Sequence, residues 1–195
     1  MDLFAASMFP RVAGGYGVIL ADPPWHFRLH SEKGEAKSPQ AHYDTMPIEE
    51  ICALPVRGLA DPAGCALVLW CTAPTLQLGM RVLEAWGFAY SSAGAWAKQS
   101  RAGGKWTFGT GYRYRSAAEF WLLGTMGQPA QRARNIRNLI VAPVREHSRK
   151  PDQMHEDIER QWPGPYVELF ARQRRPGWDA WGNQVDRFPG EDAGP

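Results

Sequence analysis

The chain has 195 residues, of which 44% are hydrophobic and 22% charged, with nine Trp, sixteen Pro and a net charge of +2. This length fits one domain, and the apolar share excludes a chain that is disordered throughout. No apolar run reaches the roughly 18–20 residues that span a bilayer, and the first residues do not resemble a signal peptide. Three cysteines without a CxxC pair argue against a disulfide framework or a cysteine-rich zinc site, so we expect a cytoplasmic protein.

The charge is unevenly distributed along the chain. Residues 1–97 carry a net charge of −3 and residues 151–195 one of −4, whereas residues 98–150 hold eleven bases and two acids, a net +9. A basic middle third between two acidic ones predicts a polyanionic partner, with a solvated basic face as the simpler alternative. We expect nucleic acid as the partner, and no membrane.

The first predicted elements alternate between strand and helix. The short apolar run at residues 16–22 predicts a buried strand, which the following Pro-Pro pair ends because proline cannot donate to a ladder. The polar residues 26–41 predict a surface loop, and residues 47–54 a short helix that opens on proline. A second strand is expected at 65–71. Residues 72–86 predict a helix that ends at a glycine, with four apolar residues at helical spacing: Leu76, Met80, Leu83 and Trp86.

The second half of the chain continues this alternation. Strands are predicted at 92–98, 118–123, 139–141 and 166–170. A loop rich in Gly, Arg and aromatic residues lies between the first two, at 99–115. Residues 151–162 predict a helix with Met154, Ile158 and Trp162 on one face. Strands that alternate with helices predict an α/β fold with a mostly parallel sheet.

The most informative motif is Asp22-Pro23-Pro24-Trp25, at the end of the first predicted strand. Open α/β sheets bind ligands at the carboxyl ends of their strands. Two prolines form a stiff turn without backbone donors, so their carbonyls are expected to be free acceptors; Asp22 adds a carboxylate and Trp25 a flat apolar face. Acceptors around such a face suit a planar ring that bears an amino group, as in adenine or cytosine. An ordinary strand-to-turn exit with a surface Asp and a buried Trp is the simpler alternative.

A series of ordered blocks carries a resemblance that covers most of the chain, from about residue 16 to 186. The blocks are ADPPW at 21–25, HYDTMP at 42–47, LVLWCT at 67–72, WAK at 96–98, EHSRKPD at 146–152, PGPYVELFAR at 163–172 and RPGWDAWGNQ at 175–184. On these blocks the chain resembles the adenine N6-methyltransferases related to the catalytic subunit of the eukaryotic mRNA adenosine methyltransferase, in their short bacterial and phage form.

This resemblance implies a fold and an activity. The fold would be a single-domain, Rossmann-like methyltransferase fold over residues 1–188, with a mostly parallel central sheet flanked by helices and a flexible tail at 189–195. The activity would be transfer of a methyl group from S-adenosylmethionine to the N6 amine of adenine. In the related amino-methyltransferases many cofactor strands end in a Gly-x-Gly turn, whereas here Phe170 is followed by Ala171 and Arg172. We therefore expect side chains rather than backbone to contact the cofactor there.

The resemblance also implies roles for individual residues. The catalytic set is Asp22, Pro23, Pro24 and Trp25, in which Asp22 and the Pro23 carbonyl take the amine hydrogens and Trp25 stacks on or walls the base. The cofactor set is Asp22, Tyr43, Lys150, Glu168, Phe170, Arg172, Asn183 and Gln184. On sequence alone, Lys150 could equally be a solvent-exposed lysine at a helix start, and Asn183-Gln184 an ordinary polar loop.

Residues 98–115 carry five bases, no acid and four aromatic residues, which suits stacking and phosphate contacts with a single strand or a flipped base. The alternative is a surface loop whose aromatic side chains pack back on the core. Glu119 follows at a strand start and could bond a base edge. The candidate substrate-binding residues are Lys98, Arg101, Lys105, Trp106, Tyr112, Arg113, Arg115 and Glu119.

The remaining expectations concern metals and the choice of substrate. His26 and His30 lack a third ligand at useful spacing, so we expect no metal site, and His147 and His155 are expected to be structural or at the surface. DNA is favoured over RNA by analogy with compact bacterial and phage members. The alternatives are RNA adenosine methylation, cytosine N4 methylation and a catalytically silent nucleic-acid-binding subunit. Because the catalytic fold uses nearly the whole chain, target recognition would fall to the loops at 26–42 and 99–115, to a homodimer or to a second subunit.

Overall fold

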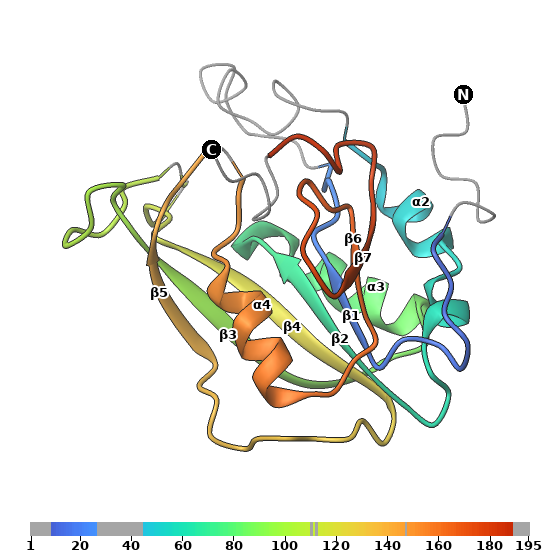
Figure 1. The fold of residues 1–195 in the computed structure, drawn as a ribbon. Coiled ribbons are helices and arrows are strands. Elements are labelled where there is room, and N and C mark those ends of the chain that lie inside the picture. Colours follow the sequence, from blue (N-terminus) through green and yellow to red (C-terminus); the bar gives the residue numbers. More distant parts are fainter. Residues whose placement is uncertain (1–8, 27–44, 110, 112, 147, 189–195) are drawn as a thin grey trace.

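The computed structural model describes residues 9–26, 45–109, 111, 113–146 and 148–188. Tyr43, Tyr112, His30, His147, nearly all of the predicted loop at 26–42 and the predicted tail at 189–195 lie outside these residues. Seven strands form one sheet in the order β5-β3-β4-β2-β1-β6-β7 (Figure 1). The strands are β1 (Val18–Ala21), β2 (Gly64–Cys71), β3 (Ala89–Gln99), β4 (Ala118–Gly127), β5 (Leu139–Pro143), β6 (Tyr166–Leu169) and β7 (Trp178–Trp181).

Only β4 runs against the other strands. It pairs antiparallel with both β2 and β3, whereas the pairs β1–β2, β1–β6, β6–β7 and β3–β5 are parallel. This confirms the predicted mostly parallel α/β sheet. It also brings the carboxyl ends of six strands and the start of β4 to one edge of the sheet, and ligands of open α/β sheets bind at that edge.

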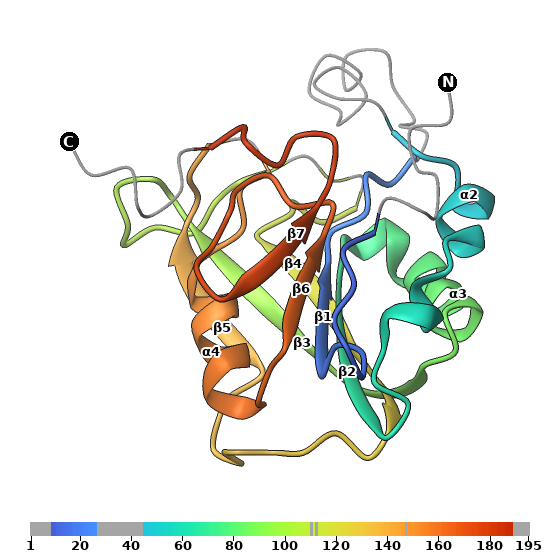
Figure 2. The same ribbon diagram turned by 45° about the vertical axis from the view of Figure 1, so that its right-hand side comes forward.

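Helices cover both faces of the sheet. They are α2 (Ile48–Ala53), α3 (Leu76–Ala85) and α4 (Gln153–Gln161), with 3-10 turns η3 (Val56–Leu59) and η4 (Ala73–Thr75). In Figure 2, α2 and α3 lie on one side of the sheet and α4 on the other. No helix in the described part of the chain is long and apolar enough to cross a membrane.

The two faces divide the hydrophobic core. Along β1, Ile19 and Ala21 belong to the cluster that packs with α2 and α3, whereas Val18 and Leu20 belong to the cluster that packs with α4. Alternate side chains of a strand point to opposite faces, so a strand that is covered on both sides reads as a continuous apolar run. This is why β1 and β2 could be predicted from the sequence.

Two predictions about local structure need correction. Met80, expected on the buried face of α3, is 42% exposed, because Gly79 faces the sheet instead. A Cβ atom at Gly79 would lie only 2.4 Å from Cys71 Sγ, so the helix approaches the sheet closely at this glycine. The second correction is β7, which was not predicted. Its two tryptophans, Trp178 and Trp181, are three residues apart and face opposite sides of the sheet, and the strand is only four residues long.

Candidate active site

A row of side chains with alternating charge lies at the carboxyl edge of the sheet. Asp22 follows β1 directly, Lys98 lies at the end of β3, Glu119 at the start of β4, and Lys150 just before α4. Lys150 Nζ is 2.6 Å from Asp22 Oδ2 and 3.4 Å from Glu119 Oε2, and Lys98 Nζ is 2.6 Å from Glu119 Oε1. Arg172 extends the row at the other end, 3.8 Å from Asp22 Oδ2. The order Arg172, Asp22, Lys150, Glu119, Lys98 is therefore an unbroken chain of ion pairs.

Burial strengthens this chain of ion pairs. Its five side chains are only 14–19% exposed, so water screens their charges little. Burial by itself would raise the pKa of Glu119, but the charges and hydrogen bonds of Lys150 and Lys98 outweigh it and hold that pKa to about 2. Burial would lower the pKa of Lys150, but the carboxylates of Asp22 and Glu119 raise it above its ordinary value. At neutral pH, Glu119 is therefore ionised and Lys150 protonated.

An aromatic floor lies beneath the two lysines. Lys150 Nζ is 5.5 Å from the centre of the Trp70 ring and Lys98 Nζ is 5.3 Å from that of Trp96. The Trp70 ring meets Trp96 and Trp121 edge-on, with centroids 6.4 and 5.4 Å apart. Ammonium groups are attracted to the faces of such rings. The floor therefore helps to hold both lysines at the edge of the sheet.

The Pro-Pro turn differs from the expectation in two respects. The Pro23 carbonyl accepts a hydrogen bond from the Trp25 N–H and the Pro24 carbonyl one from the Met46 N–H, both at 2.8 Å. Each carbonyl therefore offers one further lone pair rather than two. Trp25 is only 6% exposed, and its Nε1 donates to the Trp70 carbonyl at 3.1 Å. Its ring is thus part of the core and walls the turn, instead of offering an open face.

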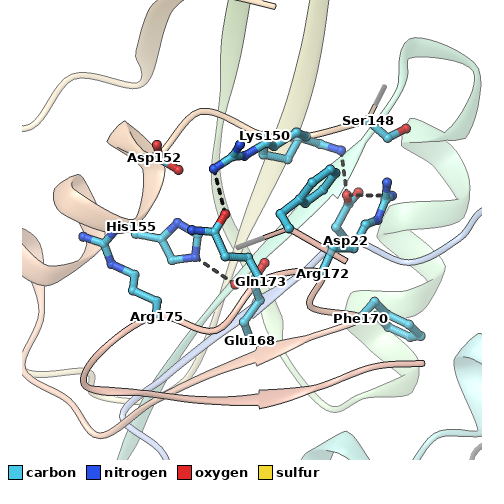
Figure 3. A pocket seen from close by; sticks show the side chains of 12 residues that line it. Asp22, Ser148, Lys150, Asp152, His155, Glu168, Phe170, Arg172, Gln173 and Arg175 are labelled. Carbon is cyan, nitrogen blue, oxygen red and sulfur yellow. Dashed lines mark hydrogen bonds and ion pairs between the residues drawn. The ribbon is translucent and has the colours of Figure 1, made fainter. Parts of the chain in front are cut away.

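A cavity opens beside Asp22, between the ends of β1 and β6 and the start of α4 (Figure 3). Five of the predicted cofactor residues line it: Asp22, Lys150, Glu168, Phe170 and Arg172. Asn183 is exposed and Gln184 half-buried in the turn after β7, and neither is among the lining residues. Asn183 and Gln184 therefore stay predictions.

Phe170 turns the backbone sharply into this cavity. Its φ angle is +62°, in the left-handed region that favours glycine. Directly after it, the Ala171 N–H donates to the Trp181 carbonyl at 3.0 Å, which ties the turn to β7. The chain therefore makes a glycine-like turn at the end of β6 without a glycine.

Several cavity residues were not predicted from the sequence. Arg149 donates to the Gln173 side chain at 2.9 Å, and its guanidinium lies 5.1 Å from the centre of the Phe188 ring. His155, expected to be structural or at the surface, also lines the cavity, where its Nε2 is 2.9 Å from Glu168 Oε2. A sequence signal existed for it, because His155 shares the helical face of Ile158 and Trp162 at spacings of three and seven.

The predicted substrate loop divides into two groups. Lys98 and Glu119 belong to the buried ion pairs. The rest of the loop carries exposed aromatic residues, since Trp106, Phe108 and Tyr114 are 62%, 81% and 90% exposed. This contradicts the alternative in which these three rings pack back on the core. The described bases of the loop are Arg101, Lys105, Arg113 and Arg115, and all four are exposed.

The family of this chain follows from its sequence relatives. The MT-A70 family model matches residues 16–184, which include Asp22, Lys150 and Arg172. The chain belongs to the MT-A70 family. Enzymes of this family take their methyl group from S-adenosylmethionine. Among the described residues, no group of three or more His, Cys, Asp or Glu side chains could hold a metal ion.

Three relatives illustrate the range of the family. A putative N(6)-adenosine-methyltransferase MT-A70-like of Medicago truncatula is 35% identical over 178 residues, which are 89% of this chain and 27% of that protein. The type II methyltransferase M.MunI of a Mycoplasma species is 32% identical over 87% of this chain and 78% of its own length. The human N(6)-adenosine-methyltransferase catalytic subunit METTL3 is 31% identical over 90% of this chain and 29% of its own length. The chain thus spans about a quarter of the length of the plant relatives it matches.

Proposed function

We propose that this chain transfers a methyl group from S-adenosylmethionine to the exocyclic N6 amine of adenine in nucleic acid, with DNA as the favoured substrate. The observation that carries the proposal is the position of the Asp22 carboxylate at the end of β1. Lys150 holds this carboxylate by an ion pair, and the cavity lies on one side of it and the start of the basic aromatic loop on the other. Family membership supports the same activity. DNA is favoured because the chain resembles short bacterial and phage members and covers 78% of its Mycoplasma relative.

In this proposal the protein activates the exocyclic amine of the base, which is a poor nucleophile. The lone pair of the amine is delocalised into the base, and acceptors that take both of its hydrogens localise that pair on nitrogen. Lys150 and Arg172 both contact the Oδ2 atom of Asp22. We assign Oδ1 and the second lone pair of the Pro23 carbonyl to the two hydrogens. Both acceptors are held rigidly, so little reorganisation is needed as positive charge develops on nitrogen.

The donor set of the cavity fits the cofactor, which when bound supplies a methyl group on a positively charged sulfur. Asp22 would hold the ammonium group, Arg172 and Glu168 the ribose hydroxyls, and Phe170 an apolar wall. The free space between the side chains is only about 50 Å³, whereas ligand pockets hold roughly 300–1,000 Å³. The cofactor therefore needs more room than this cavity offers, and the side chains that line it would have to move apart on binding.

Glu119 would restrict which base is accepted. Its low pKa keeps the carboxylate ionised, so it accepts hydrogen bonds but cannot donate one. An exocyclic amine on the base edge suits such an acceptor, whereas a base that presents only a carbonyl at that position would be repelled. This supports a base with an exocyclic amine at that position, and product analysis must separate adenine from cytosine and guanine.

The decisive experiment is methyl transfer from labelled S-adenosylmethionine to unmodified DNA and RNA, followed by nucleoside analysis. N6-methyladenine in DNA is the expected product. N6-methyladenosine in RNA alone, or N4-methylcytosine, would replace the substrate part of the proposal. Absence of any product, together with retained nucleic-acid binding, would instead support a silent binding subunit.

The exposed loop gives a separate prediction. Replacing Lys105 and Arg113 together by alanine is expected to weaken nucleic-acid binding at low salt. The slope of log K against log salt should fall by roughly 0.7–0.9 for each phosphate that the variant no longer neutralises. Fluorescence anisotropy at several salt concentrations measures both quantities. Arg81→Ala, a 57% exposed arginine on α3, is the matched control and should change neither. An unchanged slope in the double variant would contradict the assignment of this loop.

A further inference from the structure

His155 and Glu168 form a pair inside the cavity that the family resemblance did not point to. His155 lies on α4 and Glu168 on β6, and Figure 3 shows the imidazole turned toward the carboxylate. His155 Nε2 is 2.9 Å from Glu168 Oε2, and the two side chains are 14% and 19% exposed. The pair therefore joins the helix to the end of the strand where the cofactor would lie.

The His155 imidazole packs against an aromatic side chain that limits its orientation. The His155 ring meets Trp178 edge-on, with centroids 4.8 Å apart and an interplanar angle of 78°. Trp178 stacks on Tyr166 with centroids 4.8 Å apart, and its Nε1 donates to Glu159 Oε1 at 2.7 Å. Because Trp178 is held on two sides, the imidazole that rests on it has little freedom to rotate.

The contact with Glu168 assigns a donor role to one ring nitrogen. A carboxylate can only accept, so His155 Nε2 must donate to Glu168. In the described part of the chain, His155 Nδ1 is buried and has no hydrogen-bond partner. The other carboxylates that face the ring are held by arginines, Asp152 by Arg145 at 2.6 Å and Glu159 by Arg175 at 2.9 Å. The polar contact of His155 is therefore with Glu168.

We propose that His155 is a positioning residue for the cofactor, an inference that rests on the proposed function. By donating to Oε2, it holds the Glu168 carboxylate in one rotamer and leaves Oε1 for the ribose 2′-hydroxyl. A carboxylate near the end of a strand that accepts from a ribose hydroxyl is a recurrent feature of nucleotide-binding α/β folds. By donating through Nε2, the imidazole can orient such a group without occupying its second oxygen.

Two amide substitutions, each of which mimics one ring nitrogen, test this role. In His155→Gln the side-chain amide nitrogen lies near the position of Nε2 and can still donate to Glu168. In His155→Asn the amide lies near the position of Nδ1 and cannot reach it. Binding of S-adenosylhomocysteine is measured by isothermal titration calorimetry, together with the melting temperature of each protein. We expect His155→Gln to bind within about threefold of wild type and His155→Asn to bind about tenfold more weakly, since that variant cannot form the hydrogen bond to Glu168.

The cofactor analogue supplies a second control. With a 2′-deoxy form of S-adenosylhomocysteine, the difference between His155→Asn and wild type should largely disappear, because the hydroxyl that Glu168 would bind is gone. Equal affinity of wild type and His155→Asn would overturn the inference. So would equal weakness of both variants, because ring packing on Trp178 would then explain the weaker binding. If wild type itself fails to bind S-adenosylhomocysteine, the proposed function fails first.

Discussion

Asp22→Asn is expected to lower the rate of methyl transfer by about 10²–10³-fold, the usual cost of removing one group that stabilises charge in a preorganised site. The substitution keeps the size of the side chain but removes the negative charge that Lys150 and Arg172 hold at the end of β1. The rate is measured with saturating cofactor and DNA, so that weaker binding of either does not cause the decrease.

The control for this variant is Glu49→Gln, which removes one carboxylate that is 74% exposed on α2. Its rate should equal that of wild type. The melting temperature of Asp22→Asn must be recorded as well, because the substitution leaves Lys150 paired with Glu119 alone. Undiminished methyl transfer by a folded Asp22→Asn protein would contradict the assignment of Asp22 as the acceptor.

Lys150→Met is expected to have the largest effect on stability, because Lys150 is the cation between two buried carboxylates. Removing one member of a buried ion pair typically costs about 3–5 kcal/mol of unfolding free energy, and we expect the lower end of this range because Arg172 stays beside Asp22 and Lys98 beside Glu119. In the variant, Asp22 and Glu119 would face each other across the edge of the sheet without the charge that separates them. The decrease is measured by urea denaturation at pH 7, with Lys105→Met, an exposed lysine in the 99–115 loop, as the control.

The pH dependence of this decrease distinguishes charge from packing. In wild type, the pKa of Glu119 is about 2, below its ordinary value of 4.5, so its ionisation stabilises the folded state above pH 4.5 and this contribution is lost as the pH falls toward 2. In Lys150→Met, only Lys98 opposes the effect of burial on Glu119, so the pKa of Glu119 is higher than in wild type. The loss of unfolding free energy in the variant, relative to wild type, should therefore be smaller at pH 4 than at pH 7. An equal deficit at both values would mean that packing, and not charge, makes Lys150 important.

Some features of the site could be predicted because their signals are local. A continuous apolar run predicted β1, and the Pro-Pro pair after it located Asp22 at a strand end. The segment at 99–115 combined bases, aromatic residues and glycines, and three of its aromatic side chains are indeed exposed. Each of these properties depends on neighbours within a few residues along the chain.

Other features depend on contacts between distant segments. Asp22 and Lys150 are 128 residues apart, and nothing in either local sequence indicates that their side chains meet. Trp25 is buried against distant parts of the chain, where its Nε1 donates to the Trp70 carbonyl, and His155 on α4 meets Glu168 on β6. Gly79 replaces Met80 on the buried face because that helix comes very close to Cys71.

The sequence by itself determined the class of fold, the family resemblance and the strand end that carries Asp22, because strand and turn patterns depend on residues that are adjacent along the chain. The tertiary structure decided which charges meet. The strand order places β4 antiparallel between β2 and β3, so that Glu119 at its start lies beside the ends of its neighbours. Lys150 can then contact Asp22 and Glu119 together, and buried charges must be paired to be stable. Strand order and direction are properties of the whole sheet, which no single segment specifies.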